Sequence, residues 1–347
     1  MKKFVFAVLS AVMPLLAMAI TTDVQMATLQ HGNKTTVFYG VNAFVDAYNS
    51  AADSADVIIL SSGRFNTPGT ICKSISVYGA GFENDTITGT KRTEMNGLDL
   101  RHADGVDDYG EVVKGGKTVN GSYFEGICFT NTTPFKILDN SGVPVKNITI
   151  RKCSFLYILN NDESFIIQTN TENVNVIQCN IQRLELTGNA LIKNLNITSC
   201  IIHNRMVGDY ASSSSTISIR NSILRGLYRN YNYLISNSIL YGSIGSGATS
   251  KNNIFIGVDD TGTNNSNDVN WTGINEVGVW ADTGYYELKY PKKYIGTDGT
   301  QVGIYGGEYP WNIIPSTPRL LESDIDTKTS AEGILKVSIK VEAQNKE

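Results

Sequence analysis

The chain has 347 residues, of which 41% are hydrophobic and 18% charged, and its formal net charge is −4. This composition predicts a folded protein with a large hydrophobic core. A mildly acidic chain lacks the basic face that phosphate binding requires, so nucleic acid is not expected as a partner.

The first 19 residues have the features of a secretory signal peptide. Two lysines follow the initial methionine, an apolar run extends from Phe4 to Met18, and a small-x-small sequence ends at Ala19. These features predict export, and the run is too short for a membrane span. We expect residues 1–19 to be removed and no transmembrane segment to remain. The mature protein is expected to be secreted, periplasmic or at the cell surface.

Residues 20–258 are expected to form one repetitive domain that begins with a cap. A short strand is predicted over Thr35–Tyr39, and apolar residues at helical spacing between Val41 and Ala55 predict an amphipathic helix. A helix there would protect the exposed edge of the first repeats from pairing with other chains.

Two stretches follow the helix, DVIILSSGRF (56–65) and KSISVYGAGFENDT (73–86). A helix followed by these stretches resembles the start of right-handed parallel β-helix proteins with the pectin lyase-like fold. The resemblance covers about Val41 to Phe255. It implies an all-β, right-handed parallel β-helix (solenoid) with an N-terminal capping helix. It implies no single function, because that fold carries lyases, hydrolases, epimerases, adhesins and non-catalytic binders.

The loop between Arg101 and Gly116 carries three aspartates, Asp104, Asp107 and Asp108. Carboxylate oxygens are the ligands that calcium takes, and long insertions between repeats are where solenoids place binding functions. One hypothesis is therefore a calcium site at these residues, and the other is an ordinary polar loop. No other cofactor is predicted.

One pattern recurs from Asn147 to Phe255. Its copies are NITIRKCSF (147–155), NVNVIQCNI (173–181), NLNITSCII (194–202), TISIRNSIL (216–224) and NYLISNSIL (232–240). We call the seventh residue of each copy the anchor. Apolar residues alternate before the anchor, which predicts short strands with one buried face, and such strands bury that face by stacking on neighbouring copies. The repeat therefore predicts two short strands per turn of a parallel β-solenoid.

Stacking places equivalent residues in columns, at about 4.8 Å per step. The first residues of the copies, most of them asparagines, are expected to form a hydrogen-bonded ladder. The anchor column reads Cys153, Cys179, Cys200, Ser222, Ser238 and Asn253. We interpret these cysteines, together with Cys72 and Cys128, as free buried thiols, while a disulfide between neighbouring copies also fits the spacing.

The residue after the anchor is isoleucine at 201, 223, 239 and 254. Strict alternation would expose this stripe, and large apolar stripes are uncommon on soluble proteins. Either the chain turns both columns inward or the C-terminal segment, residues 312–347, covers the stripe.

The most site-like column lies three positions after the anchor and holds Gln182, His203, Arg225 and Tyr241, with Arg205 beside it. Tyrosine rings stack on sugars, guanidinium groups bind carboxylates, and His203 has the chemistry of a general base. The competing interpretation is solvated side chains on an outer corner.

Residues 259–347 are expected to form a polar loop and a β-strand segment that packs on the repeats or extends them. The glycine-rich stretch from Tyr290 to Trp311 resembles the closing segment of exported β-helix repeat proteins from gut-type Gram-negative bacteria. Two strands are predicted over Arg319–Asp326 and Ile334–Val341.

Pectin-cleaving hydrolases of the resembled fold share Asn-Thr-Asp, Asp-Asp, Gly-His-Gly and Arg-x-Lys segments. The first three do not occur at the corresponding strands, and Arg151-Lys152 does not match the fourth. The favoured hypothesis is an exported, non-catalytic β-helix that presents a rigid surface to a glycan or another cell-surface macromolecule. The alternative is a polysaccharide lyase or glycoside hydrolase with an atypical site, so enzymatic activity stays open.

Overall fold

The computed structural model describes residues 25–342 with short gaps. The gaps are residues 53, 87–88, 107–108, 131–132, 140, 157–163, 188–189, 208–213, 229–232, 246, 261, 265–266, 283 and 326–328. The predicted signal peptide and the predicted calcium ligands Asp107 and Asp108 lie outside the described residues. None of the helices in the described part of the chain is long and apolar enough to cross a membrane.

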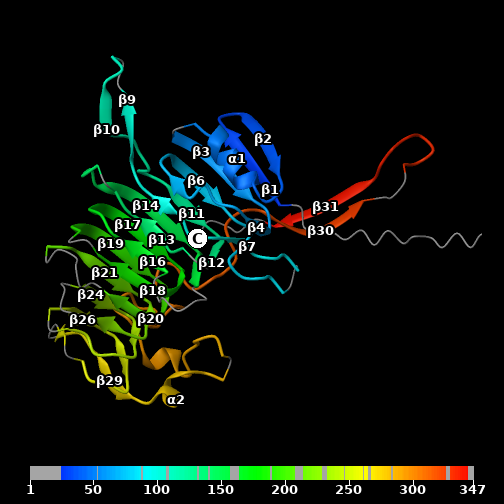
Figure 1. Cartoon of the computed structure of the whole chain (residues 1–347). Coiled ribbons are helices and arrows are strands. Elements are labelled where there is room, and N and C mark those ends of the chain that lie inside the picture. Colours follow the sequence, from blue (N-terminus) through cyan, green and yellow to red (C-terminus); the bar gives the residue numbers. More distant parts are fainter. Residues whose placement is uncertain are drawn as a thin grey trace, which may run out of the picture.

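Most of the described chain forms two large sheets of mainly parallel strands (Figure 1). In spatial order, sheet A contains β2 (Lys34–Tyr39), β1 (Met26–His31), β3 (Ser54–Leu60), β6 (Ser74–Tyr78), β11 (Tyr123–Glu125), β14 (Val145–Arg151), β17 (Thr171–Ile177), β19 (Ile192–Thr198), β21 (Ile217–Arg220), β24 (Tyr233–Ser236), β26 (Thr249–Lys251) and β28 (Thr263–Asn264). Only β1 runs against its neighbours β2 and β3. The predicted all-β class and stacked repeat are confirmed.

The main path of sheet B contains β29 (Trp271–Ile274), β27 (Ile254–Ile256), β25 (Ile239–Leu240), β22 (Ile223–Leu224), β20 (Ile201–Val207), β18 (Asn180–Leu186), β15 (Ser154–Leu156), β12 (Ile127–Thr130), β7 (Thr93–Met95) and β4 (Gly63–Phe65). Beside this path lie β13 (Phe135–Ile137), β16 (Phe165–Ile167), β23 (Leu227–Tyr228), β5 (Thr70–Ile71) and β8 (Asp99–Leu100). The chain alternates between the sheets, and each repeat adds one strand to sheet A and one or two strands to sheet B.

The inward side chains of both sheets form one continuous hydrophobic core. At the N-terminal end of this core lies α1 (Ala43–Ser50), which buries Ala43, Phe44, Ala47 and Tyr48. The predicted helix is therefore confirmed. Phenylalanines fill the middle of the core, where Phe155 stacks between Phe129 at 5.2 Å and Phe165 at 4.9 Å between ring centroids.

A sharp corner joins each sheet A strand to the following sheet B strand. The residue before the anchor has a positive φ in six successive corners: Lys152, Gln178, Ser199, Asn221, Asn237 and Asn252. This conformation reverses the local chain direction and costs most residues free energy, so stacking has to maintain it. The anchors then point inward, and their side chains accept backbone hydrogen bonds, as from Cys200 N to Ser222 Oγ (3.1 Å) and from Ser222 N to Ser238 Oγ (3.1 Å).

The predicted asparagine ladder is confirmed in its first steps. Asn173 Nδ2 donates to Asn147 Oδ1 at 3.1 Å, and Asn194 Nδ2 donates to Asn173 Oδ1 at 3.0 Å. The ladder runs along the outer edge of sheet A and links neighbouring repeats through side chains as well as backbone.

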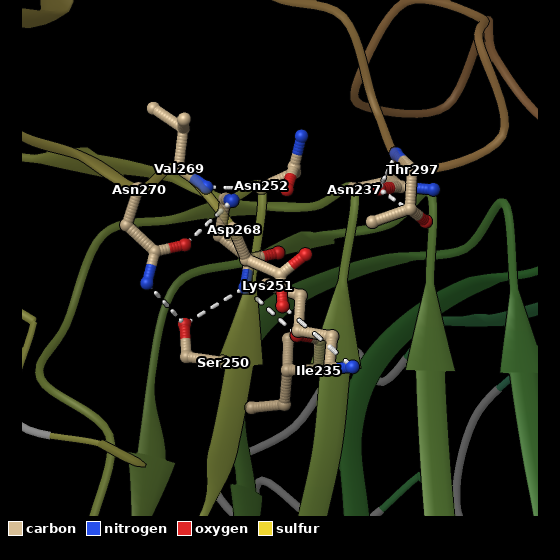
Figure 2. A network of polar contacts seen from close by, with 10 residues as sticks. Ile235, Asn237, Ser250, Lys251, Asn252, Asp268, Val269, Asn270 and Thr297 are labelled. Atoms are coloured by element: carbon tan, nitrogen blue, oxygen red, sulfur yellow. Dashed lines mark hydrogen bonds and ion pairs between the residues drawn. The ribbon is translucent and has the colours of Figure 1, made fainter. Parts of the chain in front are cut away.

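The anchor column continues past Asn253, the last anchor that the sequence pattern identifies. Asn253 N donates to Asn270 Oδ1 at 2.9 Å, and β29 pairs in parallel with β27. Figure 2 shows this end of the molecule, where Ser250 accepts a hydrogen bond from Asn270 and Lys251 faces Asp268 at 3.6 Å. The pairing therefore continues past Phe255, through a stretch whose sequence is too polar to show the alternation.

All five cysteines are free, as the favoured interpretation predicts. Burial raises the pKa of the Cys153 and Cys179 thiols well above the ordinary value, and it raises that of Cys128 to about 11. Each of these thiols is held in its neutral form because the thiolate would lose its hydration in the core.

We expect a thiol-specific disulfide reagent at pH 8 to modify the native protein at Cys72 alone, because the thiolate is the reactive species and only Cys72 is partly exposed. In denaturant all five thiols should react. Mass spectrometry of the labelled peptides checks this, and rapid native labelling of Cys153, Cys179 or Cys200 would contradict it.

Two hairpins leave the body of the molecule (Figure 1). The stretch that we expected to be a loop between Arg101 and Gly116 contains β9 (Ala103–Val106) paired with β10 (Val112–Lys117). Sequence reasoning missed it because neither strand has a buried face, and Val106 is 72% exposed. The two predicted C-terminal strands are β30 (Arg319–Ile325) and β31 (Val337–Glu342), which pair with each other.

Candidate binding groove on sheet A

A segment near the C-terminus, residues 295–316, runs back along the corners between the sheets. We call it the strap. Its contacts follow the repeats in reverse order: Asn252 Nδ2 donates to Ile295 O at 3.0 Å, Gln178 Nε2 to Pro310 O at 2.5 Å, and Lys152 Nζ to Ile314 O at 2.7 Å. Three of the corner residues with positive φ, Lys152, Gln178 and Asn252, therefore have a second task, since their side chains hold the strap.

Asn237 binds the strap most extensively of the corner residues described. Its Oδ1 accepts hydrogen bonds from Thr297 N at 2.9 Å and Thr297 Oγ1 at 3.3 Å, and its Nδ2 donates to Asp298 Oδ2 at 3.1 Å (Figure 2 shows Asn237 and Thr297). Gly296 lies so close to Asn237 that a Cβ would be 2.6 Å from its side chain, which explains glycine at this strap position.

Glu125 holds the far end of the strap. Its side chain is fully buried and accepts hydrogen bonds from Ser316 N (2.7 Å), Ser316 Oγ (2.8 Å) and Tyr123 Oη (2.5 Å). Burial raises the pKa of Tyr123, and the neighbouring Glu125 carboxylate adds to this shift. A carboxylate surrounded by donors fixes the strap against sheet A more firmly than neutral hydrogen bonds would.

The isoleucine stripe is covered, but not by the segment that we expected. Ile201, Ile223, Ile239 and Ile254 form a second hydrophobic core with residues from 279 to 304, including Val279, Leu288, Tyr294, Val302 and Ile304. The covering segment also includes α2 (Glu276–Val279) and a 3-10 helix, η1 (Pro291–Lys293). Among the side chains that the structure describes, those of this second core lie between residues 201 and 311, whereas we expected residues 312–347 to supply the cover.

Between the strap and the outer face of sheet A lies a groove. Two adjoining hollows of about 410 and 570 Å³ share Thr198, Arg220, Glu308 and Tyr309. The groove reaches from Tyr123 on β11 to Lys251 on β26, across seven neighbouring strands. At about 4.8 Å per strand it is roughly 29 Å long.

The floor of the groove is polar and carries positive charge. Arg151, Arg220 and Lys251 lie in one column of sheet A, two positions before the anchor in their repeats. A neighbouring column presents amides, in which Asn196 Nδ2 donates to Asn175 Oδ1 at 3.1 Å. Guanidinium groups and amides on a rigid sheet suit a ligand that carries carboxylates and hydroxyls along its length.

The wall of the groove comes from the strap. Tyr309 places its ring over Arg151, with 5.7 Å from the guanidinium carbon to the ring centroid. A hydrogen bond to Glu308 raises the pKa of Tyr309. Asp298 accepts hydrogen bonds from Asn237 and Thr300. The wall therefore offers an aromatic face and the carboxylates of Asp298 and Glu308 beside the cationic floor.

The predicted site column is partly brought together. Arg225 lies over the Tyr241 ring, 5.0 Å from the centroid, and His203 Nε2 lies 2.5 Å from Asn180 Oδ1. Burial lowers the pKa of His203, and the Arg225 charge adds to the shift, which favours the neutral imidazole. Gln182 lies on β18, and Arg205 lies on β20 opposite Arg183. This column lies on sheet B, away from the groove.

The calcium hypothesis gains no support from the residue that the structure describes. Asp104 lies on β9, where its Oδ1 accepts a hydrogen bond from Gly115 N at 3.2 Å. Among the described residues, no group of three His, Cys, Asp or Glu side chains is placed to hold a metal ion.

Comparison with family models, curated proteins and solved structures finds no match for this chain. Sequence reasoning passed over the groove because its residues occupy outward positions of ordinary strands. The available signal was the column two positions before the anchor, where Arg151, Arg220 and Lys251 recur among smaller residues.

Proposed function

We propose that this protein is an exported right-handed parallel β-helix of the pectin lyase-like fold that binds an extended acidic glycan, without cleaving it, in the groove on sheet A. The observation that carries the proposal is the groove itself, with Arg151 and Arg220 on its floor and Tyr309 on its wall. The two parallel sheets support the fold, and the N-terminal sequence supports export.

The chemistry of the floor favours a polyuronide over a neutral polymer. Guanidinium groups form charge-assisted hydrogen bonds with carboxylates, and these are stronger than hydrogen bonds between neutral groups. Arg151 and Arg220 are three strands apart in one column, at a separation of about 14 Å. A rigid floor with this spacing selects a ligand whose carboxylates recur along an extended chain, since little ordering of the protein is needed on binding.

We expect Arg220→Gln to weaken the binding of a hexauronide about tenfold, through loss of about 1.4 kcal/mol of charge-assisted hydrogen bonding. Isothermal titration calorimetry at low salt measures this. The matched control is Arg64→Gln, an exposed arginine on sheet B whose nearest carboxylate is Glu94 at 3.6 Å, and it should bind as the wild type does.

The same experiment separates binding from catalysis. Stable binding without new reducing or unsaturated ends supports the proposal, whereas steady turnover that Arg220→Gln abolishes would replace it with the lyase or hydrolase alternative. Absence of saturable binding by the wild type, or equal losses in Arg64→Gln and Arg220→Gln, would overturn it.

A further inference from the structure

A second aromatic surface lies beside sheet B in the last repeats, on the segment that covers the isoleucine stripe. All three tryptophans of the chain lie between residues 271 and 311. Trp280 and Tyr286 are partly exposed and pack with one side on the second core. Their rings meet edge to face, with centroids 5.4 Å apart and planes at 78°. Together they form a floor and a wall.

Tyr241 continues the floor beside Trp280. The two ring planes differ by 22°, and Trp280 Nε1 donates to Tyr241 Oη at 2.8 Å. The two rings are nearly parallel, with centroids 6.5 Å apart, and the hydrogen bond fixes Tyr241 against Trp280.

Polar groups of both signs border this surface. Tyr241 Oη donates to Glu276 Oε1 at 3.0 Å, and the exposed Arg225 lies over the Tyr241 ring. Burial raises the pKa of Tyr241, with the hydrogen bond to Glu276 as the next cause, so the phenol stays a neutral donor. The carboxylate of Glu276 accepts hydrogen bonds and the guanidinium of Arg225 donates them. Sugar hydroxyl groups can do both, so this pair of side chains suits a neutral sugar better than a ligand that carries only negative or only positive charge.

The backbone of Tyr286 gives an independent indication. Its φ is 59°, in the left-handed region that glycine adopts freely and a bulky aromatic residue avoids. The ring of Tyr286 packs with one side on the second core and leaves part of its surface exposed. A strained residue that persists with its ring against a partly exposed tryptophan is the pattern of a functional position.

We propose that Trp280 and Tyr286 form a second glycan site that stacks one neutral hexopyranose ring, with Tyr241 holding Trp280 in place and Arg225 and Glu276 binding the hydroxyl groups of the sugar. Apolar C–H faces of sugars pack on aromatic rings, and a few placed polar groups orient the ring. The inference is independent of the acidic-glycan proposal, because no residue of this surface borders the groove on sheet A.

The sharpest test is Tyr286→Gly, which removes the ring and relieves the strained φ. We expect this variant to stay folded while losing at least tenfold in affinity for β-1,4-linked glucohexaose or mannohexaose, measured by calorimetry. Tyr286→Phe keeps the ring and should bind within about twofold of the wild type. Arg225 is exposed and lies outside the turn that holds Tyr286, so Arg225→Gln leaves that turn unchanged. This variant should weaken binding severalfold.

Arg220→Gln in the groove serves as the control that separates the two sites, and it should bind the neutral hexaoses as the wild type does. The inference is overturned if neither hexaose binds the wild type, if Tyr286→Gly binds like the wild type, or if Arg220→Gln loses the neutral ligands as well.

Discussion

Glu125→Ala is expected to lower the free energy of unfolding by about 3 kcal/mol and to release the strap from sheet A. The substitution removes the acceptor of three hydrogen bonds at a fully buried position and leaves Ser316 N and Tyr123 Oη without it. A buried donor that loses its partner costs about 1–3 kcal/mol, and bonds to a charged acceptor lie at the upper end of that range. Urea unfolding followed by tryptophan fluorescence measures the loss.

The release of the strap has its own readout. In the variant, limited proteolysis should cut between Ile295 and Ser316 at enzyme concentrations that leave the wild type intact, since cleavage follows the population of the open form. Hexauronide affinity should fall too, because Tyr309 on the strap forms the groove wall.

Glu172→Ala is the control on the same sheet: this carboxylate is exposed and pairs with Lys146, and the unfolding midpoint should not change. Wild-type stability and protease resistance in Glu125→Ala would show that Glu125 does not hold the strap.

Phe155→Ala is expected to cost about 4 kcal/mol of stability without changing the groove directly. Phe155 is fully buried, stacks between Phe129 and Phe165, and meets Phe135 edge to face at 5.4 Å. Truncating a core phenylalanine to alanine costs about 3–5 kcal/mol, because the lost transfer free energy adds to the cost of the cavity. Three neighbouring rings cannot all collapse into that space, so the cavity should persist.

The matched substitution is Phe155→Leu, which keeps most of the volume and should cost less than half as much. Equilibrium urea unfolding of the wild type and both variants gives the two differences in the free energy of unfolding. If the free energy depends on urea concentration with the same slope in all three proteins, the unfolded state is not altered. If alanine and leucine destabilised equally, the loss would come from ring-ring geometry and not from the cavity.

Much of the repeat could be predicted because its signals are local. Ile148 and Ile150 alternate with polar residues, and this alternation reports which face of a strand is buried. The anchors and the asparagine ladder follow from the same periodicity, since parallel stacking in register places identical positions beside one another. The helix over Ala43–Ser50 was predictable for a similar reason.

The candidate site was predictable only in part. Arg225 and Tyr241 share a column in the sequence and do meet, but their partners Trp280 and Glu276 come from a segment with no repeat pattern. The hairpin at β9–β10 was missed because exposed strands carry no buried face for the pattern to report.

The sequence by itself determined the strands, their inward faces, the stacking columns and the need to cover the isoleucine stripe, because short-range periodicity encodes burial. Only the tertiary structure decided what covers the stripe and where the groove lies. Lys152 and Gln178 hold the strap by donating to the backbone carbonyls of Ile314 and Pro310. A carbonyl oxygen is the same in every residue, so such a contact across more than a hundred positions leaves no mark in the amino-acid pattern.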